Sequence, residues 1–194
     1  MKSVYIIHGW DGSPEEPLHQ WLKAQLESKG YQVTVPAMPN PEVPVIKDWI
    51  LKIMETVVPS DNVILVGHSV GCQAILRSVE VLAEGTKIAG IVLIAPWMEL
   101  DEQTVQEEGE EVREIAQPWM ETPIDFKKVK KHTDRVITIF SDNDPYVPVS
   151  QKDLFEDKLD AETFVLEGYG HFSPADGVDK LPVVLDVIES IKQS

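Results

Sequence analysis

Residues 62–83 combine a short apolar run, the pentapeptide Gly67-His68-Ser69-Val70-Gly71 and an amphipathic stretch. The apolar run at 63–66 is rich in β-branched side chains, which predicts a strand buried on both faces. The stretch after the pentapeptide has apolar residues at helical spacing, namely Ile75, Leu76, Val79, Leu82 and Ala83. A G-x-S-x-G sequence between strand and helix predicts a nucleophile elbow, whose strained turn holds the serine hydroxyl clear of the sheet. An ordinary glycine-containing turn is the alternative interpretation.

The alternation of strand and helix extends over the whole chain. Six apolar segments are predicted as strands, with helical segments between them and after the last. This order predicts a parallel sheet with right-handed crossovers and helices on both faces. The predicted strands are 3–7, 31–35, 63–66, 88–94, 136–140 and 162–166, and the predicted helices include 17–29, 45–58, 151–159 and 181–191. We therefore expect an α/β fold in which residues 1–194 form a single domain.

The charge and cysteine content limit the possible partners. A net charge of −16 argues against nucleic acid or an anionic membrane as a partner. The single cysteine, Cys72, excludes an internal disulfide and a multi-cysteine metal site. The apolar run at 4–7 is too short for a signal-peptide core, and no segment reaches the roughly 20 apolar residues of a membrane span. We expect a cytoplasmic protein.

Three residue types needed for nucleophilic catalysis follow three different predicted strands. Ser69, Asp144 and His171 follow the strands at 63–66, 136–140 and 162–166. Because the carboxyl ends of parallel strands share one edge of a sheet, the three side chains are predicted to meet there. A serine nucleophile needs a base within hydrogen-bond reach and an acid to orient that base. The order Ser, Asp, His along the chain is that of α/β hydrolases.

Each of these assignments has an alternative. A histidine in a glycine-rich loop such as Gly168-Tyr169-Gly170-His171-Phe172 can be an ordinary surface residue. Asp142 lies near the same strand end as Asp144, but we expect Asp142 to cap the turn and Asp144 to orient His171. Pro145 fixes the backbone directly after Asp144, which favours this choice.

Two backbone N–H groups are predicted to form an oxyanion hole. The negative charge of a tetrahedral intermediate needs donors that are already in place. Val70 begins the helix after the elbow, and Trp10 follows Gly9 in the loop that leaves the first strand. We expect the N–H groups of Val70 and Trp10 to be these donors. A merely tight strand-to-helix turn is the alternative for the segment around Trp10.

Aromatic and apolar side chains near the same edge are expected to form a shallow pocket for a small acyl group. The candidate pocket residues are Trp10, Met38, Trp97, Trp119, Tyr146 and Phe172, some of which could instead belong to the core. Only about forty residues separate Ile94 from Arg135, too few for an independent cap domain. Residues 99–114 carry eight acidic side chains against one base and are split by Gly109. We expect two short solvated helices there, with an acidic lid as the alternative.

The remaining histidines and the cysteine are expected to have structural roles. His8 is predicted to brace the loop after the first strand, and His68 to form a local hydrogen bond away from the serine hydroxyl. His19 and His132 are predicted to be surface or helix-face residues. Cys72 follows the serine by three positions and is predicted to pack beneath the elbow.

Short motifs over nearly the whole chain are shared with one family of hydrolases. They are His8-Gly9 with His19 and Trp21, Met38-Pro39-Asn40-Pro41 with Trp49, Gly67-His68-Ser69-x-Gly71, Pro118-Trp119, Ser141-x-x-Asp144-Pro145-x-x-Pro148, Gly170-His171-Phe172 and Leu181-Pro182. On these motifs the chain resembles the retinoblastoma-binding protein 9 family of small serine hydrolases, within the α/β-hydrolase superfamily. The resemblance implies hydrolase activity, a triad of Ser69, Asp144 and His171, and a fold without a large cap domain. A pocket-protein-binding Leu-x-Cys-x-Glu motif is absent, because Val70 and Ala74 flank Cys72 at the required positions.

The sequence thus predicts a serine hydrolase acting on a small-molecule acyl substrate, an ester, thioester or amide. No metal and no cofactor are expected, because serine, histidine and aspartate suffice for this chemistry. Dehalogenase or epoxide-hydrolase chemistry would need an aspartate at position 69. The alternative is a binding protein of the same fold with vestigial or weak activity, since fold does not fix function.

Overall fold

A computed structural model describes residues 2–191 and contains a six-stranded sheet. All neighbouring strands are parallel, in the order β2-β1-β3-β4-β5-β6. The strands are β1 (Ser3–Ile7), β2 (Gln32–Thr34), β3 (Val63–His68), β4 (Gly90–Ile94), β5 (Val136–Ser141) and β6 (Glu162–Leu166). The predicted α/β-hydrolase architecture is therefore confirmed.

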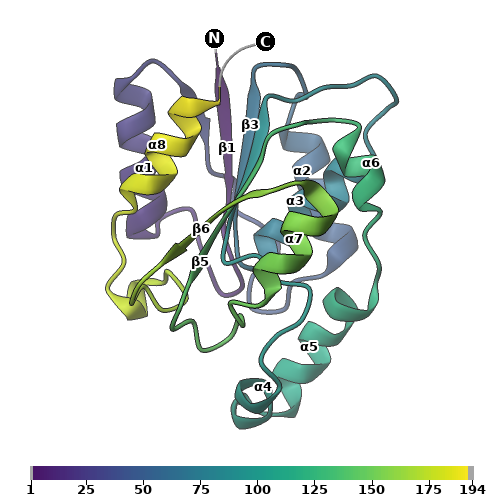
Figure 1. Ribbon diagram of the computed structural model, residues 1–194, viewed down its shortest axis with the longest axis vertical. Helices are drawn as coiled ribbons and strands as arrows, with labels where there is room; N and C mark the ends of the chain where they lie inside the picture. The colour runs from purple at the N-terminus through teal and green to yellow at the C-terminus, as the bar shows by residue number, and fades with distance from the viewer. Residues whose placement is uncertain (1, 192–194) are drawn as a thin grey trace.

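Helices cover both faces of the sheet (Figure 1). One face is covered by α1 (Pro17–Ser28) and α8 (Pro182–Ser190). The other is covered by α2 (Ile46–Thr56), α3 (Val70–Glu80), α6 (Phe126–Lys130) and α7 (Gln151–Leu159). Proline occupies the first turn of α1 and of α8, where its missing N–H would have no partner in any case. Among residues 2–191, none of the helices has the length and hydropathy that a membrane span requires.

Two further helices project from the carboxyl edge of the sheet (Figure 1). They are α4 (Glu102–Glu108) and α5 (Glu110–Glu121), and Gly109 separates them as predicted. The second helix runs past the predicted end at residue 114 and includes Pro118. It continues because Ala116 and Trp119 are buried, and the Trp119 indole N–H donates to the Pro44 carbonyl at 2.9 Å. Burial of this face outweighs the proline and the acidic composition.

Helix α6 was not predicted from the sequence. It has five residues, of which only Val129 is buried. A helix this short carries too few apolar positions to show a period. Asp125 stabilises its start by accepting hydrogen bonds from the N–H groups of Lys127 and Lys128.

The junction between β3 and α3 is shorter than predicted. Strand β3 extends to His68 and helix α3 begins at Val70, so Ser69 alone joins them. Ser69 has φ 53° and ψ −124°, a backbone conformation that L-residues rarely adopt. A Cβ at Gly71 would lie 2.5 Å from the carbonyl oxygen of His8 and 2.6 Å from that of Ile7. The first turn of α3 therefore packs directly against the end of β1.

Gly71→Ala tests this close approach. Alanine is favoured over glycine within a helix by about 0.5–1 kcal/mol, so propensity alone would stabilise the variant. We expect the backbone clash to lower the free energy of unfolding by about 3 kcal/mol instead. Chemical denaturation followed by circular dichroism measures the change. The control is Gly85→Ala, which adds strain at φ 83° but no contact within 4 Å. An unchanged stability of Gly71→Ala would contradict the expectation.

Candidate active site

Ser69, His171 and Asp144 form a continuous chain of hydrogen bonds. Ser69 Oγ lies 2.9 Å from His171 Nε2, and His171 Nδ1 lies 2.8 Å from Asp144 Oδ2. The three residues follow β3, β6 and β5, and their side chains meet at the carboxyl edge of the sheet. The structure therefore brings together the three residues that the sequence singled out for nucleophilic catalysis.

The two candidate carboxylates have different partners. Asp144 Oδ1 accepts hydrogen bonds from the backbone N–H groups of Tyr146 and Val147, which leaves Oδ2 to face His171. Asp142 Oδ1 accepts from the N–H of Gly168 at 2.9 Å. The side chain of Asp144 is only 2% exposed, so its hydrogen bond with His171 is shielded from water. Asp142 was expected to cap the turn after its own strand, but it instead bonds to the loop after β6.

Three polar side chains hold the loop that carries His171. Asn143 Oδ1 accepts from the N–H of Gly170 at 2.8 Å, and Asp176 Oδ2 accepts from the N–H of His171 at 3.0 Å. The His68 ring donates from Nε2 to the His171 carbonyl oxygen at 2.8 Å. The sequence did not point to Asn143 and Asp176, because isolated polar residues in loops carry no spacing signal. A local bond was expected for His68, whereas the bond joins the elbow to the loop after β6.

Trp10 and Val70, the two expected oxyanion donors, both have their backbone near Ser69. Val70 is the first residue of α3, directly after Ser69. A Cβ at Gly9 would lie 3.2 Å from Ser69 Cβ, which brings the backbone next to Trp10 close to the serine. Within residues 2–191, neither the Trp10 nor the Val70 backbone N–H has a hydrogen-bond acceptor. Both donors are therefore free to bind a ligand oxygen.

The side chain of Trp97 contacts the serine. The buried Trp97 indole donates from Nε1 to Ser69 Oγ at 3.4 Å. Sequence analysis placed Trp97 in the pocket but did not assign this hydrogen bond. This hydrogen bond is long and therefore weak. The Ser69 hydroxyl oxygen has a second lone pair, which can accept a bond from another donor.

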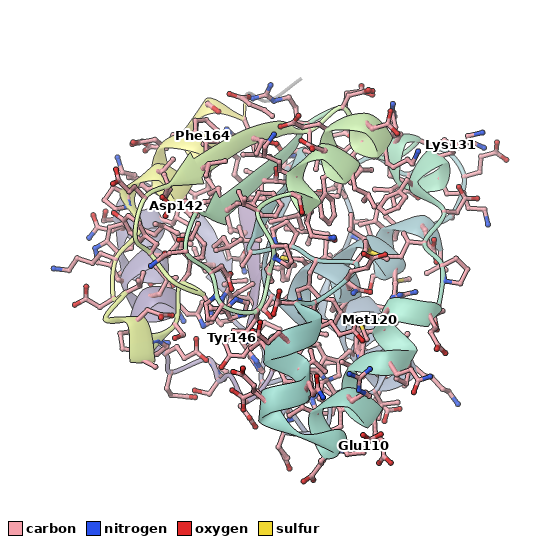
Figure 2. All side chains as sticks on the ribbon, turned by 60° about the horizontal axis from the view of Figure 1, so that its bottom comes forward. Glu110, Met120, Lys131, Asp142, Tyr146 and Phe164 are labelled. Carbon is pink, nitrogen blue, oxygen red and sulfur yellow. The ribbon has the colours of Figure 1, made fainter. Side chains whose placement is uncertain are left out.

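A cavity of about 680 Å³ opens at Ser69. Three of the six predicted pocket residues, Trp10, Trp97 and Tyr146, line it together with His68 and His171. Its apolar wall comes from the region of α4 and α5 and consists of Leu100, Val105, Val112 and Ile115. Figure 2 shows Tyr146 beside these two helices, with Glu110 at their far end. The cavity is within the usual size range for small-molecule sites.

The other three predicted pocket residues do not line this cavity. Met38 is buried, and its backbone N–H donates to His8 Nε2 at 3.0 Å, so it braces the loop after β1. Trp119 is buried on the inner face of α5 and borders a separate apolar groove. Phe172 is buried and stacks on Tyr169 with 5.8 Å between ring centroids. All three are packing residues, the alternative that the sequence left open.

The cavity is strongly acidic. Its lining includes five carboxylates, Asp11, Glu16, Glu42, Glu108 and Glu111, and no lysine or arginine among the residues that the structure describes. Residues 99–114 are therefore more than a solvated face, because Glu108 and Glu111 from this segment line the cavity. Within residues 2–191, the nearby charge disfavours anions in the cavity.

Three structural assignments are corrected or confirmed by burial. His19 and His132 are buried rather than surface residues, and their Nδ1 atoms bond to the carbonyl oxygens of Ser13 and Thr86. Cys72 is fully buried as predicted, with its thiol near the Ile94 carbonyl at 3.3 Å. Burial raises the pKa of the Cys72 thiol well above its usual range, so it is not a nucleophile.

A family model described as serine hydrolase matches residues 4–190. The chain belongs to the serine hydrolase family. The match spans nearly the whole fold and includes all three residues of the hydrogen-bonded chain at Ser69. The protein is accordingly a hydrolase, as the sequence predicted.

The chain matches two curated relatives over most of their length. The chain is 33% identical over 192 residues to the YdeN protein of Bacillus subtilis (strain 168), which is named as a hydrolase, with 97% of this chain and 95% of YdeN covered. It is 27% identical over 183 residues to the serine hydrolase RBBP9 of Rattus norvegicus, with 93% and 87% covered. The resemblance to the retinoblastoma-binding protein 9 family is thus real but distant.

Solved structures confirm the fold. The crystal structure of the ydeN gene product from B. subtilis has a TM-score of 0.85 at 31% identity, with 98% of each chain covered. The structure of Est1E from Butyrivibrio proteoclasticus with bound ferulic acid has a TM-score of 0.70 at 15% identity, covering 97% of this chain and 90% of Est1E. At that identity the second likeness concerns the fold alone.

Proposed function

We propose that this hydrolase cleaves a small ester, thioester or amide through an acyl-enzyme intermediate on Ser69. The observation that carries the proposal is the continuous hydrogen-bond chain from Asp144 through His171 to Ser69, with links of 2.8 and 2.9 Å. As Ser69 Oγ attacks the acyl carbon, His171 Nε2 takes the hydroxyl proton. Asp144 keeps the other ring proton on Nδ1 and stabilises the imidazolium that forms.

The tetrahedral intermediate breaks down when His171 gives the proton that it accepted to the leaving group. The leaving group receives that proton as its bond to the acyl carbon breaks, and the acyl group stays on Ser69. Water then attacks the acyl-enzyme with His171 again as base, which releases the acid and restores the hydroxyl. In both steps the oxyanion binds the N–H groups of Val70 and Trp10, whose lack of other acceptors within residues 2–191 supports this role.

Ser69→Ala tests the nucleophile. We expect the variant to lose covalent labelling by a fluorophosphonate probe, because no hydroxyl is left to attack phosphorus. Its turnover of activated esters should fall by several orders of magnitude. Gel fluorescence and ester hydrolysis measure the two effects, with Ser150→Ala on the exposed surface as control. Equal labelling of Ser69→Ala and wild type would refute the mechanism, and no labelling of the wild type would favour a binding protein.

Asp144→Asn and Asp142→Asn test which carboxylate orients His171. Only Asp144 contacts the ring, at 2.8 Å, whereas Asp142 bonds to the Gly168 N–H. We expect Asp144→Asn to lower kcat by roughly 10⁴, since an asparagine would favour the wrong histidine tautomer. Asp142→Asn retains an acceptor for the turn and should cost far less. Steady-state hydrolysis of an activated ester distinguishes the two, and a larger loss for Asp142→Asn would reverse the assignment.

The acidic cavity predicts a preference among acyl groups of different charge. We expect p-nitrophenyl 4-(trimethylammonio)butyrate to be hydrolysed with a kcat/KM about tenfold above that of the glutarate half-ester. The neutral isostere, p-nitrophenyl 5,5-dimethylhexanoate, should lie between them. The spread should shrink with added salt and in Glu111→Gln, which removes one lining charge. Glu156→Gln, exposed on α7, is the matched control, and a faster anionic ester at low salt would contradict the prediction.

A further inference from the structure

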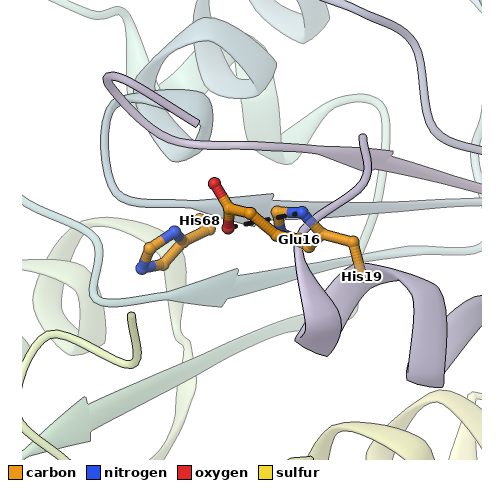
Figure 3. A group of neighbouring side chains, drawn as sticks. All are labelled: Glu16, His19 and His68. Carbon is orange, nitrogen blue, oxygen red and sulfur yellow. Dashed lines mark ion pairs between the residues drawn. The ribbon is translucent and has the colours of Figure 1, made fainter. Parts of the chain in front are cut away.

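Two histidines and a glutamate gather on the side of the cavity opposite α4 and α5. One nitrogen of His19, one nitrogen of His68 and one carboxylate oxygen of Glu16 lie within 4.8 Å of one another. Figure 3 shows the Glu16 carboxylate between the two imidazoles, with its ion-pair contact to His19 dashed. Glu16 and His68 also line the cavity at Ser69. The proposed mechanism does not use Glu16 or His19.

Hydrogen bonding fixes the tautomers of both rings. A carbonyl oxygen can only accept, so His19 Nδ1 carries a proton for the Ser13 carbonyl and His68 Nε2 carries one for the His171 carbonyl. Each ring therefore keeps a lone pair on its other nitrogen. Burial lowers the pKa of both rings and keeps them neutral, despite the opposing effect of Glu16 on His19.

One of these lone pairs has no partner. His19 is 1% exposed, and its Nε2 is a buried polar atom without a hydrogen bond within residues 2–191. An unpartnered buried polar atom is costly in a folded protein. The bonds of Glu16 to Ser13 and of His19 to Ser13 account for the loop geometry, but they leave this nitrogen unexplained. A bound ligand that accepts an electron pair would give His19 Nε2 a partner.

Two glycines let the loop after β1 approach the cluster closely. A Cβ at Gly9 would lie 3.1 Å from His68 Nδ1, the nitrogen that keeps its lone pair. A Cβ at Gly12 would lie 2.6 Å from the Glu16 carboxylate. A side chain at either position would therefore press on His68 or Glu16. Because Glu16 and His68 line the cavity, an ion from solvent can reach them.

We propose that Glu16, His19 and His68 bind a divalent transition-metal ion, and that the bound ion inhibits hydrolysis at Ser69. Two neutral imidazoles and one carboxylate suit Zn²⁺ and its neighbours in the first transition row, whereas Mg²⁺ prefers oxygen ligands. Tetrahedral Zn²⁺ holds such ligand atoms about 3.4 Å apart. Side-chain movements on the order of 1 Å bring the three ligand atoms to this spacing.

Inhibition follows from the bonds that His68 makes, and this part rests on the proposed function. His68 Nε2 holds the carbonyl oxygen of His171, so drawing His68 toward an ion shifts the loop that carries the base. The rings of His68 and His171 lie 5.1 Å apart. A doubly charged ion beside His68 would also oppose the imidazolium that His171 forms on accepting the serine proton. Both effects lower kcat more than they raise KM.

Calorimetric titration of the full chain with ZnCl₂ tests binding without any substrate. We expect one saturable site in the wild type and the absorption bands of tetrahedral Co²⁺ when CoCl₂ is used instead. Glu16→Gln keeps an acceptor for the Ser13 N–H but loses the charge, and should weaken Zn²⁺ binding by at least about tenfold. Glu111→Gln makes the same charge change in the same cavity outside the cluster and should change affinity less than threefold. His132→Asn controls for a buried histidine elsewhere.

The outcomes separate the site from general attraction of cations. Equal weakening by Glu16→Gln and Glu111→Gln, or displacement of Zn²⁺ by excess Mg²⁺, would mean that the acidic cavity alone collects the ion and would overturn the proposal. The absence of a saturable Zn²⁺ site would do the same. Zn²⁺ bound in the cluster without loss of ester hydrolysis would overturn the inhibition. EDTA should restore the hydrolysis that Zn²⁺ suppresses in the wild type, and Glu16→Gln should need at least about tenfold more Zn²⁺.

Discussion

The steric constraint at Ser69 governs the rest of the structure. A single residue joins a buried strand to a helix, and it does so at φ 53° and ψ −124°. Such a conformation costs about 1–3 kcal/mol and persists only where the surroundings enforce it. Here β3 is buried along its whole length, and the first turn of α3 packs on the carbonyl groups at the end of β1. The core thus fixes the direction of the serine side chain before any catalytic partner contacts it.

The partners of Ser69 come from loops that polar atoms tie to one another. Asn143 links the loop after β5 to the N–H of Gly170 after β6, and Asp176 holds the N–H of His171. His68 connects the elbow to the carbonyl of the same residue. Each bond uses a backbone group that would otherwise lack a partner in a loop. These contacts position His171 between Ser69 and Asp144 without a regular element beneath it.

The sequence predicts the parts of this structure that repeat or alternate. The strands follow from apolar runs, and the edge shared by Ser69, Asp144 and His171 follows from the parallel order of those strands. Burial of single side chains could not be predicted in the same way. His19 was expected to be a surface or helix-face residue. It lies on α1, but it is buried, because the loop before α1 folds over it and Ser13 bonds to its ring. The two short helices after β4 were predicted, but their part in the cavity was not, because acidic residues dominate the composition of a segment whose Val112 and Ile115 line the cavity.

The protonation of the histidines around Ser69 completes the connection between fold and chemistry. Burial lowers the pKa of His8, His19 and His68, and for each of them desolvation is the largest cause. In neutral form these rings add no positive charge near the nucleophile and do not compete for its proton. The Nδ1 atom of His171 contacts Asp144 at 2.8 Å, and carboxylates line the cavity beside this ring. In the proposed reaction, the cation created by proton transfer therefore forms on a ring whose Nδ1 is hydrogen-bonded to a buried carboxylate.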